Sequence, residues 1–557
     1  MMRMELGSYQ IRVDARLEQW KGMDLSDRIR RKDATLWPDA PPQEVRDSLG
    51  WLSLGKTMRP RIDDIVDLAR QVRSEGITDA VLLGMGGSSL APCVFGRTFG
   101  VAEGSPNLTV LDSTHPDAVK GVREKVDPAT TLFIVSSKSG TTMETLSLFR
   151  YFWKEAEAVA ANAGPHFIAV TDPGSPLSQL GAKRGFRRVF EAPPDVGGRY
   201  SALSTFGLVP AALIGADVRA LLQNAYDTWE NEAAADEHGS GAVLGAALGE
   251  LTTSGRDKIT VLASHSVRTF PMWVEQLVAE STGKNGKGMV PIVDEPMIRP
   301  EAYPSDRTFV GLSLRGDGRG VDDRMDELGE AGHPTIRMTI DGVIELGRAM
   351  FEWELAIATA ATVMGIDPFD QPDVEATKDI TRRIMTGDSS DTGSFRRAET
   401  FHLDEPEPLA AAIDDWSSQA RHGDYLSIQA YLGYGPEIHA ELRRLQEDLL
   451  SGMGIATSMV YGPRFLHSTG QLHKGGPNTG LFLQLVDRTG SDISVPGTDH
   501  TFGELIHAQA LGDLAVLRDR GRRVLRVDIG REGAEGVSRL RKHIAASIRP
   551  KVVGVMA

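Results

Sequence analysis

The 557-residue chain contains one cysteine, Cys93, which excludes an intrachain disulfide and a metal site built from cysteines. It has no run of eighteen or more uncharged apolar residues, so the sequence predicts no membrane-spanning helix. The first twenty residues mix acidic and basic side chains, unlike a secretory signal peptide. We therefore expect a cytoplasmic protein.

Basic residues are also comparatively few. There are 61 lysines and arginines against 76 acidic residues, and the formal net charge is −15. This balance argues against nucleic acid or an anionic membrane as a partner. A small anionic ligand would need a site made locally, for example by helix N-termini. Hydrophobic residues make up 41% of the chain, which is sufficient for several cores.

The order of apolar runs predicts an α/β protein. Short buried runs such as 80–83, 108–111 and 132–135 alternate with amphipathic stretches of helical length. This alternation is typical of doubly wound parallel sheets, and it restarts twice further along the chain. A polar stretch at 385–394 is typical of a tether. We predict an N-terminal helical arm and three α/β units, at residues 1–54, 55–215, 216–385 and 400–557.

Two similar tetrapeptides relate the second unit to the third. The second unit contains Glu280-Ser-Thr-Gly, and the third contains His467-Ser-Thr-Gly. Each precedes glycine- and lysine-rich sequence, and later a long helix before an apolar run, at 342–364 and 502–520. The pattern indicates a degenerate repeat.

Two loops follow predicted buried strands and open helices. The first, at 84–89, reads Gly-Met-Gly-Gly-Ser-Ser, and the second, at 136–142, reads Ser-Ser-Lys-Ser-Gly-Thr-Thr. The second combines five hydroxyls, a lysine and backbone N–H groups at a helix N-terminus, so it predicts a phosphate cradle. It lacks the Walker spacing, and no acidic residue after the first loop clearly suits a dinucleotide ribose.

Four segments together resemble motifs of the glucose-6-phosphate isomerase family. They lie at 83–92, 136–142, 195–201 and 369–378, in the family's order. The resemblance covers roughly residues 50 to 385 and implies two sugar-isomerase (SIS-type) domains, followed here by a third, degenerate SIS-like unit. The chain is most similar to the isomerase part of bacterial proteins in which this enzyme is fused to transaldolase. A functional link to transaldolase is therefore an expectation.

The resemblance implies an aldose–ketose isomerase that interconverts glucose 6-phosphate and fructose 6-phosphate without cofactor or metal. Glu280 matches the base that moves a proton between C2 and C1, Arg199 the cation that stabilises the enediolate, and Lys378 the lysine that assists ring opening. A carboxylate and a permanently charged guanidinium suit these tasks chemically. The residues implied to bind substrate are Gly87, Ser88, Ser137, Lys138, Ser139, Thr141, Thr142, Gln276 and Gln371.

The sequence departs from the family pattern in two places. Asp373 stands where the family has glycine or alanine, which is expected to add a carboxylate close to the site. The ring-opening histidine, which in the family comes from the neighbouring subunit, is missing between Glu280 and Lys378. We predict that the third unit imitates that subunit and supplies His467 in cis, with His473 as the alternative. The chain would then function as a monomer, although a homodimer remains open.

Two other functions remain open at this point. The same mechanism could act on another 6-substituted hexose, such as mannose 6-phosphate or a sulfonated hexose. A non-catalytic SIS-type sensor of sugar phosphates is the third possibility. Retention of Glu280, Arg199 and Lys378 argues against a sensor, because binding alone does not require a base.

Overall fold

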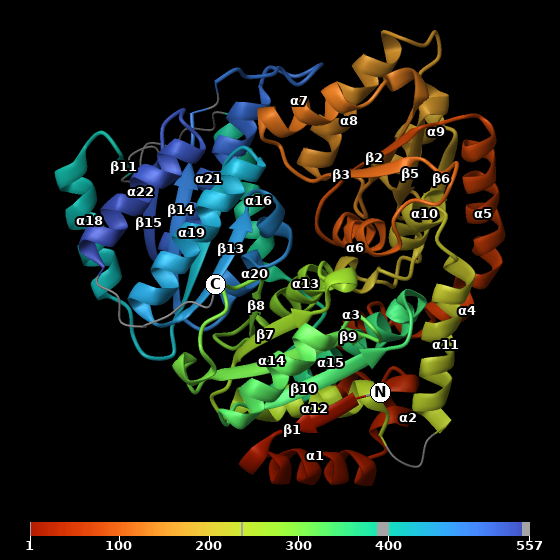
Figure 1. Ribbon diagram of the computed structural model, residues 1–557. Coiled ribbons are helices and arrows are strands. Elements are labelled where there is room, and N and C mark those ends of the chain that lie inside the picture. Colours follow the sequence, from red (N-terminus) through yellow and green to blue (C-terminus); the bar gives the residue numbers. More distant parts are fainter. Residues whose placement is uncertain (1, 235–237, 387–399, 489, 549–557) are drawn as a thin grey trace.

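The computed structural model describes residues 2–234, 238–386, 400–488 and 490–548. It contains three five-stranded sheets covered by helices (Figure 1). Within these described residues, every strand pair is parallel except one, so the expected α/β class with parallel sheets is confirmed. Across the described residues, no helix is long and apolar enough to cross a membrane.

The first unit contains a sheet of order β3-β2-β4-β5-β6. Its strands are β2 Asp79–Gly84, β3 Asn107–Leu111, β4 Thr131–Ser136, β5 Phe167–Thr171 and β6 Arg188–Glu191. Its helices are α5 Arg59–Ser74, α6 Leu90–Phe99, α7 Pro116–Lys125, α8 Met143–Glu157, α9 Pro176–Arg184 and α10 Thr205–Leu213. In this strand order, β2 and β4 flank the point where the winding reverses, and doubly wound sheets bind ligands there. The two loops singled out in the sequence leave the carboxyl ends of these strands.

The second unit has the order β1-β10-β9-β7-β8. Its strands are β1 Met2–Glu5, β7 Lys258–Ala263, β8 Val290–Val293, β9 Arg307–Leu314 and β10 Thr335–Ile340. Its helices are α11 Val218–Ala234, α12 Ser240–Thr253, α13 Phe270–Thr282, α14 Arg319–Glu330, α15 Leu346–Met364 and α16 Pro372–Thr386. The N-terminal strand β1 pairs antiparallel with β10. The predicted helical arm therefore also completes a sheet.

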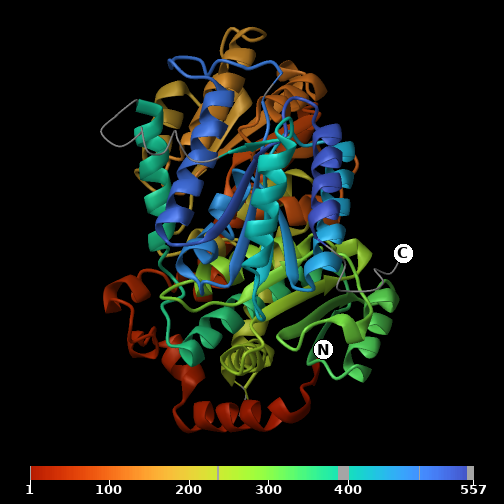
Figure 2. The ribbon, with the colours of Figure 1, turned by 90° about the vertical axis from the view of Figure 1, so that its left-hand side faces the viewer.

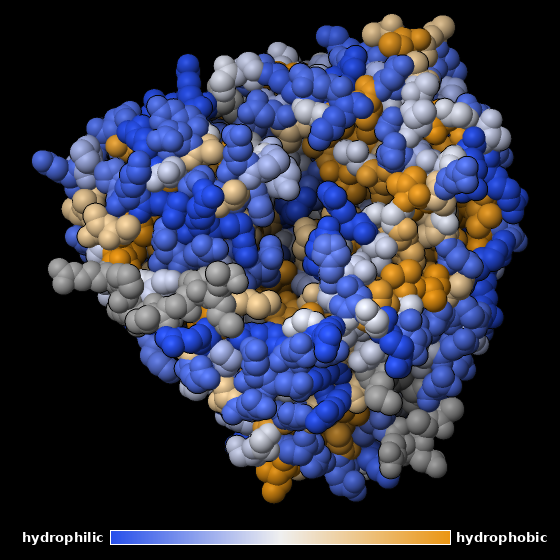
Figure 3. Space-filling view, in the orientation of Figure 1, coloured by the Kyte–Doolittle hydropathy of each residue, from blue (hydrophilic) through white to orange (hydrophobic). Residues whose placement is uncertain are grey.

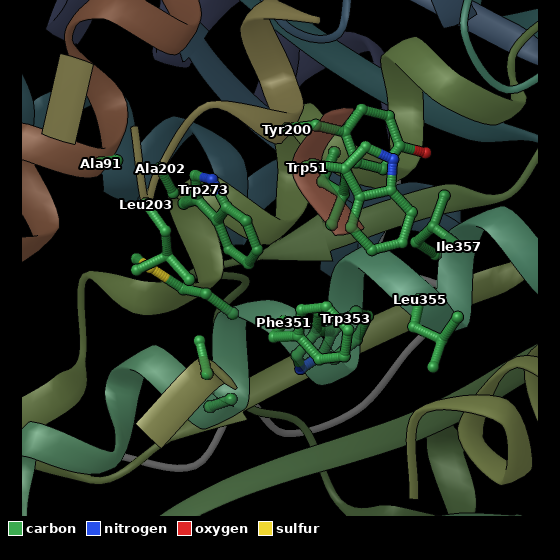
Figure 4. Packing of buried hydrophobic residues seen from close by; sticks show 14 of the residues in the cluster. Trp51, Ala91, Tyr200, Ala202, Leu203, Trp273, Phe351, Trp353, Leu355 and Ile357 are labelled. Carbon is green, nitrogen blue, oxygen red and sulfur yellow. The ribbon is translucent and has the colours of Figure 1, made fainter. Parts of the chain in front are cut away.

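The rest of the arm packs against the second unit (Figures 1 and 2). Its helices are α1 Gln10–Gly22, α2 Leu25–Arg30, α3 Pro42–Arg46 and α4 Leu54–Thr57. Trp51, just before α4, stacks on Tyr200 with the ring centroids 5.3 Å apart, and Phe351 lies beside it (Figure 4). Tyr200 follows Arg199, so the arm helps to fix the backbone that carries this arginine. The arm and the first two units share one large hydrophobic core.

The third unit has the order β11-β15-β14-β12-β13 and a hydrophobic core of its own. Its strands are β11 Phe401–His402, β12 Tyr425–Tyr431, β13 Ala456–Tyr461, β14 Gly480–Val486 and β15 Arg523–Asp528. Its helices are α18 Pro406–Ser418, α19 Pro436–Met453, α20 Gly470–Gly475, α21 Phe502–Asp519 and α22 Ala534–Ser547. The edge strand β13 was not expected, because its Ala-Thr-Ser-Met-Val-Tyr sequence lacks a continuous apolar run. Of the predicted tether, 387–394 lies outside the described residues, and the two residues before it end α16.

The second and third units share a strand order, β10-β9-β7-β8 matching β15-β14-β12-β13. The tetrapeptides that indicated a repeat nevertheless hold different places. Glu280 lies on the helix after the inner strand β7, whereas His467 follows the edge strand β13. The long helices also differ, because α15 leads into α16 while α21 connects β14 with β15. The repeat is thus one of topology, and the motif correspondence is wrong.

The third unit is joined to the second by a buried apolar cluster. Residues from both units form it: Ala279, Val290, Ile292, Tyr425, Ala456, Leu472, Phe482 and Leu517. In the space-filling view the surface is hollowed between the third unit and the first (Figure 3). Because Ala279 belongs to the apolar cluster, the third unit covers the end of α13, the helix that carries Glu280.

Candidate active site

The glycine-rich loop after β2 lies where all three units meet. Gly86 has a positive φ of 55°, and a Cβ there would lie 2.7 Å from the carbonyl oxygen of His467 and 3.0 Å from Nε2 of Gln276. A Cβ on Gly87 would collide with the carbonyl of Gly198. Only glycine permits both the conformation and these approaches. The adjacent Ser88 is buried in the same loop.

Glu280 and Arg199 face one another inside the protein. The Oε2 atom of Glu280 accepts a hydrogen bond of 3.0 Å from Nε2 of Gln276, one helical turn earlier on α13. The same oxygen lies 3.8 Å from a guanidinium nitrogen of Arg199. Only 5% of Glu280 and 4% of Arg199 is exposed. Burial raises the pKa of Glu280, because it disfavours the charged form, and Arg199 and Gln276 offset part of that rise.

The guanidinium of Arg199 is held by three further acceptors. Its Nε donates to the Ser281 hydroxyl at 2.9 Å, and one terminal nitrogen donates to the carbonyls of Pro368 and Asp370 at 2.7 and 2.9 Å. These contacts use Nε and one terminal nitrogen, and the other terminal nitrogen faces Glu280. A rigidly held cation beside a carboxylate is suited to stabilising a developing oxyanion.

Lys284 is a buried cation that the sequence reasoning did not assign. Its Nζ donates to the carbonyl of Asp367 and to the carboxylate of Asp370. Burial, together with nearby Arg199, lowers its pKa to about 8. It lies four residues after Glu280, a spacing that could have marked it as a candidate.

His467 reaches this site from the third unit of the same chain. Its Nε2 lies 2.8 Å from Oε1 of Glu144, and its backbone carbonyl accepts a 2.9 Å hydrogen bond from Gln276. Gln509 donates to the same Glu144 oxygen at 2.7 Å. Burial alone would raise the pKa of Glu144, but the imidazole of His467, a backbone N–H and the charge of Lys378 together outweigh it, so the net direction is downward. Glu144 was not predicted from the sequence, although it lies in the first turn of α8, directly after the cradle loop.

His473, the alternative histidine, does not lie at the site. Its ring is buried in the third unit, with Nδ1 3.2 Å from Nε2 of Gln429 and with Tyr425 and Phe482 around it. Burial lowers its pKa well below the ordinary value. The alternative is therefore corrected, because a histidine packed among aromatic rings cannot reach a substrate at Glu280.

The cradle loop is held in shape by its own hydroxyls. Ser137 Oγ lies 2.9 Å from Thr142 Oγ1 and accepts the N–H of Gly140, while Thr141 donates to Ser139 through both its N–H and its hydroxyl. Together these residues form the turn that leads into α8. A helix N-terminus favours an anion, because its first backbone N–H groups have no partner within the helix.

Lys138 does not extend into the cradle. Its Nζ donates to Asp172 at 2.7 Å and to the carbonyl of Pro194 at 3.2 Å. Its charge is thus already paired with a carboxylate. Any phosphate would be held mainly by the hydroxyls and backbone N–H groups.

Helix α16 carries the last predicted residues. Lys378 is partly exposed and donates to Glu375 at 2.7 Å, so it makes no contact with Glu280 in this structure. Gln371 is half-buried immediately before the helix. Asp373 does not add a carboxylate to the site as expected, because it turns toward the third unit and pairs with Arg520 at 2.6 Å.

The phosphoglucose isomerase family model matches residues 62–294. The chain is 30% identical to a glucose-6-phosphate isomerase from Rubrobacter xylanophilus over 412 residues, which are 65% of this chain and 93% of that one. It is 28% identical to a glucose-6-phosphate isomerase of Campylobacter jejuni over 381 residues, covering 60% of this chain and 92% of the relative.

Two solved structures share the fold. A hypothetical protein of Thermus thermophilus superposes with a TM-score of 0.57 at 25% identity, covering 69% of this chain and 99% of that one. A glucose-6-phosphate isomerase from Chlamydia trachomatis gives a TM-score of 0.58 at 19% identity, covering 67% and 86%. On the extent and identity of the Rubrobacter match, this chain belongs to the glucose-6-phosphate isomerase family.

Proposed function

We propose that this protein interconverts glucose 6-phosphate and fructose 6-phosphate through an enediolate. The observation that supports this most directly is the buried pair of Glu280 and Arg199 beside the Gly86 loop, with His467 next to the same glutamine. A base, a fixed cation and a proton-transferring imidazole are what an aldose–ketose isomerisation requires.

In the proposed isomerisation, the carboxylate of Glu280 removes the proton from C2 of the open-chain aldose. The electron pair forms the C1–C2 double bond of the enediolate, and Arg199 stabilises the negative oxygen. Glu280 then returns the proton to C1, while the hydroxyl proton moves between O1 and O2. The product is the ketose, and no atom is gained or lost.

Ring opening precedes this step. We assign it to His467, which Glu144 holds in one orientation, with assistance from Lys378, whose charge also acts on Glu144. Because these groups belong to one chain, a monomer would carry a complete site. A homodimer remains an alternative.

The phosphate is assigned to the loop before α8. Ser137, Ser139, Thr141 and Thr142 lie at this helix N-terminus, where the helix dipole favours an anion. The glycine-rich loop and Gln371 would contact the sugar. The first unit thus supplies the anion site and Arg199, while the second supplies Glu280 and the third His467.

An enzyme-coupled assay in both directions tests the function. Turnover of glucose 6-phosphate and fructose 6-phosphate is expected. Faster turnover of mannose 6-phosphate or a sulfonated hexose would reassign the substrate, and binding without turnover would indicate a sensor. The link to transaldolase rests on the likeness to the fused proteins and would be tested by co-purification of the two activities.

The pH dependence follows from the burial of Glu280. The carboxylate must be ionised to accept the C2 proton, and burial raises its pKa above the ordinary value of about 4.3. We expect kcat/KM to fall as the pH drops through this raised pKa, before an exposed carboxylate would titrate. A pH profile of kcat/KM with an acidic limb at or below the ordinary value would contradict this prediction.

A further inference from the structure

Gln471 is a fully buried side chain that joins three separate segments around the site. Its Nε2 donates to the carbonyl of Gly283 at 2.9 Å and to Oδ2 of Asp373 at 2.8 Å. Its Oε1 accepts the backbone N–H of Asp373 at 3.0 Å. The side-chain amide of Gln471 thus bonds to the end of α13 and to the start of α16, while its own backbone lies in α20.

Each of these segments carries one of the proposed functional groups. Gly283 ends helix α13 three residues after Glu280, and Asp373 lies in the first turn of α16, five residues before Lys378. Gln471 itself follows His467 by four residues. At about 1.5 Å per helical residue, the links on α13 and α16 lie within roughly 8 Å of Glu280 and Lys378 along the chain.

The junction has little room for adjustment. A Cβ on Gly475 would collide with the Asp373 carboxylate and would lie 2.6 Å from the carbonyl of Gly283 and 2.7 Å from Nε2 of Gln471. Gly283 in turn lies against the backbone of Leu472, which a Cβ would overlap. Close packing of this kind transmits a displacement instead of absorbing it.

The charge of Asp373 is compensated within the junction. Arg520 on the third unit lies 2.6 Å from Oδ1, while Gln471 occupies Oδ2. A buried carboxylate needs such partners, since an unpaired one is costly. The aspartate that departs from the family pattern is therefore explained as an anchor for α16 on the third unit.

We propose that Gln471 is a positioning residue that sets the placement of Glu280, Lys378 and His467 relative to one another. It does not touch the substrate in this scheme and acts only through the segments it bonds. This inference rests on the proposed isomerase function. It assigns the third unit a second task besides supplying a histidine, which is to hold the lysine helix in register with the base.

The first test is Gln471→Met, which keeps the volume but removes all three hydrogen bonds. We expect kcat to fall about tenfold to a hundredfold, as for other losses of supporting hydrogen bonds and sub-ångström placement. The phosphate cradle lies on the first unit and should be undisturbed. The affinity for 6-phosphogluconate, an acyclic probe measured by calorimetry, is therefore expected to change less than threefold.

The second test is a pairwise exchange. Gln471→Glu places a carboxylate against Asp373 and is expected to lower kcat further than Gln471→Met. Adding Asp373→Asn restores a donor between the two positions, so the double variant should recover at least about tenfold in kcat. No recovery in the double variant would overturn the link between Gln471 and the lysine helix.

A matched control separates positioning from stability. Glu295 also joins the second and third units, since its Oε1 accepts from Arg307 and from the N–H of Thr457 at 2.8 and 2.7 Å, but it contacts none of the three segments. Glu295→Gln should lower the unfolding temperature with kcat unchanged.

Equal loss of kcat in the Glu295 and Gln471 variants, in proportion to stability, would show a merely structural role and overturn the proposal. Wild-type kcat in a folded Gln471→Met protein would overturn it too. Failure of the proposed function looks different, because the unaltered protein itself would then fail to turn over either hexose phosphate.

Discussion

Glu280→Gln is expected to lower kcat by about 10²–10⁴-fold, the range typical for loss of a general base. The amide keeps the shape and can still accept the hydrogen bond from Gln276, but it cannot take a proton from C2. Because burying an ionised carboxylate costs stability, the unfolding temperature should be unchanged or higher. Steady-state kinetics and thermal unfolding on the same preparation would measure both effects.

The control for this variant lies on the same helix. Glu275 is a half-buried carboxyl group, and desolvation raises its pKa to about 8, with Arg464 opposing the rise. It has no role in the proposed mechanism, so Glu275→Gln should retain wild-type kcat. Wild-type turnover in Glu280→Gln would remove Glu280 from the mechanism, whatever the control shows.

His467→Ala is expected to lower kcat with cyclic substrate by about 10²–10³-fold, within the usual contribution of a proton-transferring side chain. Glu144→Gln should give a smaller loss, because the imidazole remains but loses the carboxylate that orients it. His439→Gln is a suitable control, since this half-buried histidine of the third unit pairs with Tyr461 and not with the site. Full activity of His467→Ala would contradict the assignment.

Mixing two inactive variants tests whether His467 acts in cis. If each chain supplies its own histidine, Glu280→Gln and His467→Ala proteins should remain inactive when mixed, even after denaturation and refolding together. Recovery of activity would mean that the histidine crosses between chains in a dimer. Truncation near residue 385 is less informative, because it would expose Ala279, Val290 and Ile292, which the third unit covers.

Local pattern was sufficient to predict much of this protein. The apolar runs of β2, β4 and β5 predicted buried parallel strands, because helices cover both faces of such a sheet. The loops after β2 and β4 were identifiable for the same reason, since glycines and hydroxyls at a strand-to-helix turn have a local function. Glu280 and Arg199 were candidates from their motifs, and the fold brings them within 3.8 Å.

Other features depend on contacts between distant parts of the chain. Strand β1 exists only because β10 offers it an edge, and a short N-terminal segment gives no such signal. Lys138 was predicted to lie near the phosphate, yet Asp172, 34 residues later, pairs with it. His467 and His473 lie in the same loop segment, and the sequence does not distinguish them. In the structure His473 is buried among aromatic rings, whereas His467 contacts Glu144.

The α/β class, the two loops at strand-to-helix turns and the family resemblance could be predicted, because each depends on residues that are close together in the chain. The contact of His467 with Glu144, 323 residues away, and the link that Gln471 makes between α13 and α16 appear only in the folded protein. Such pairs follow from how the third unit packs on the other two. That packing is a sum of many weak contacts between distant segments, and no local pattern encodes it.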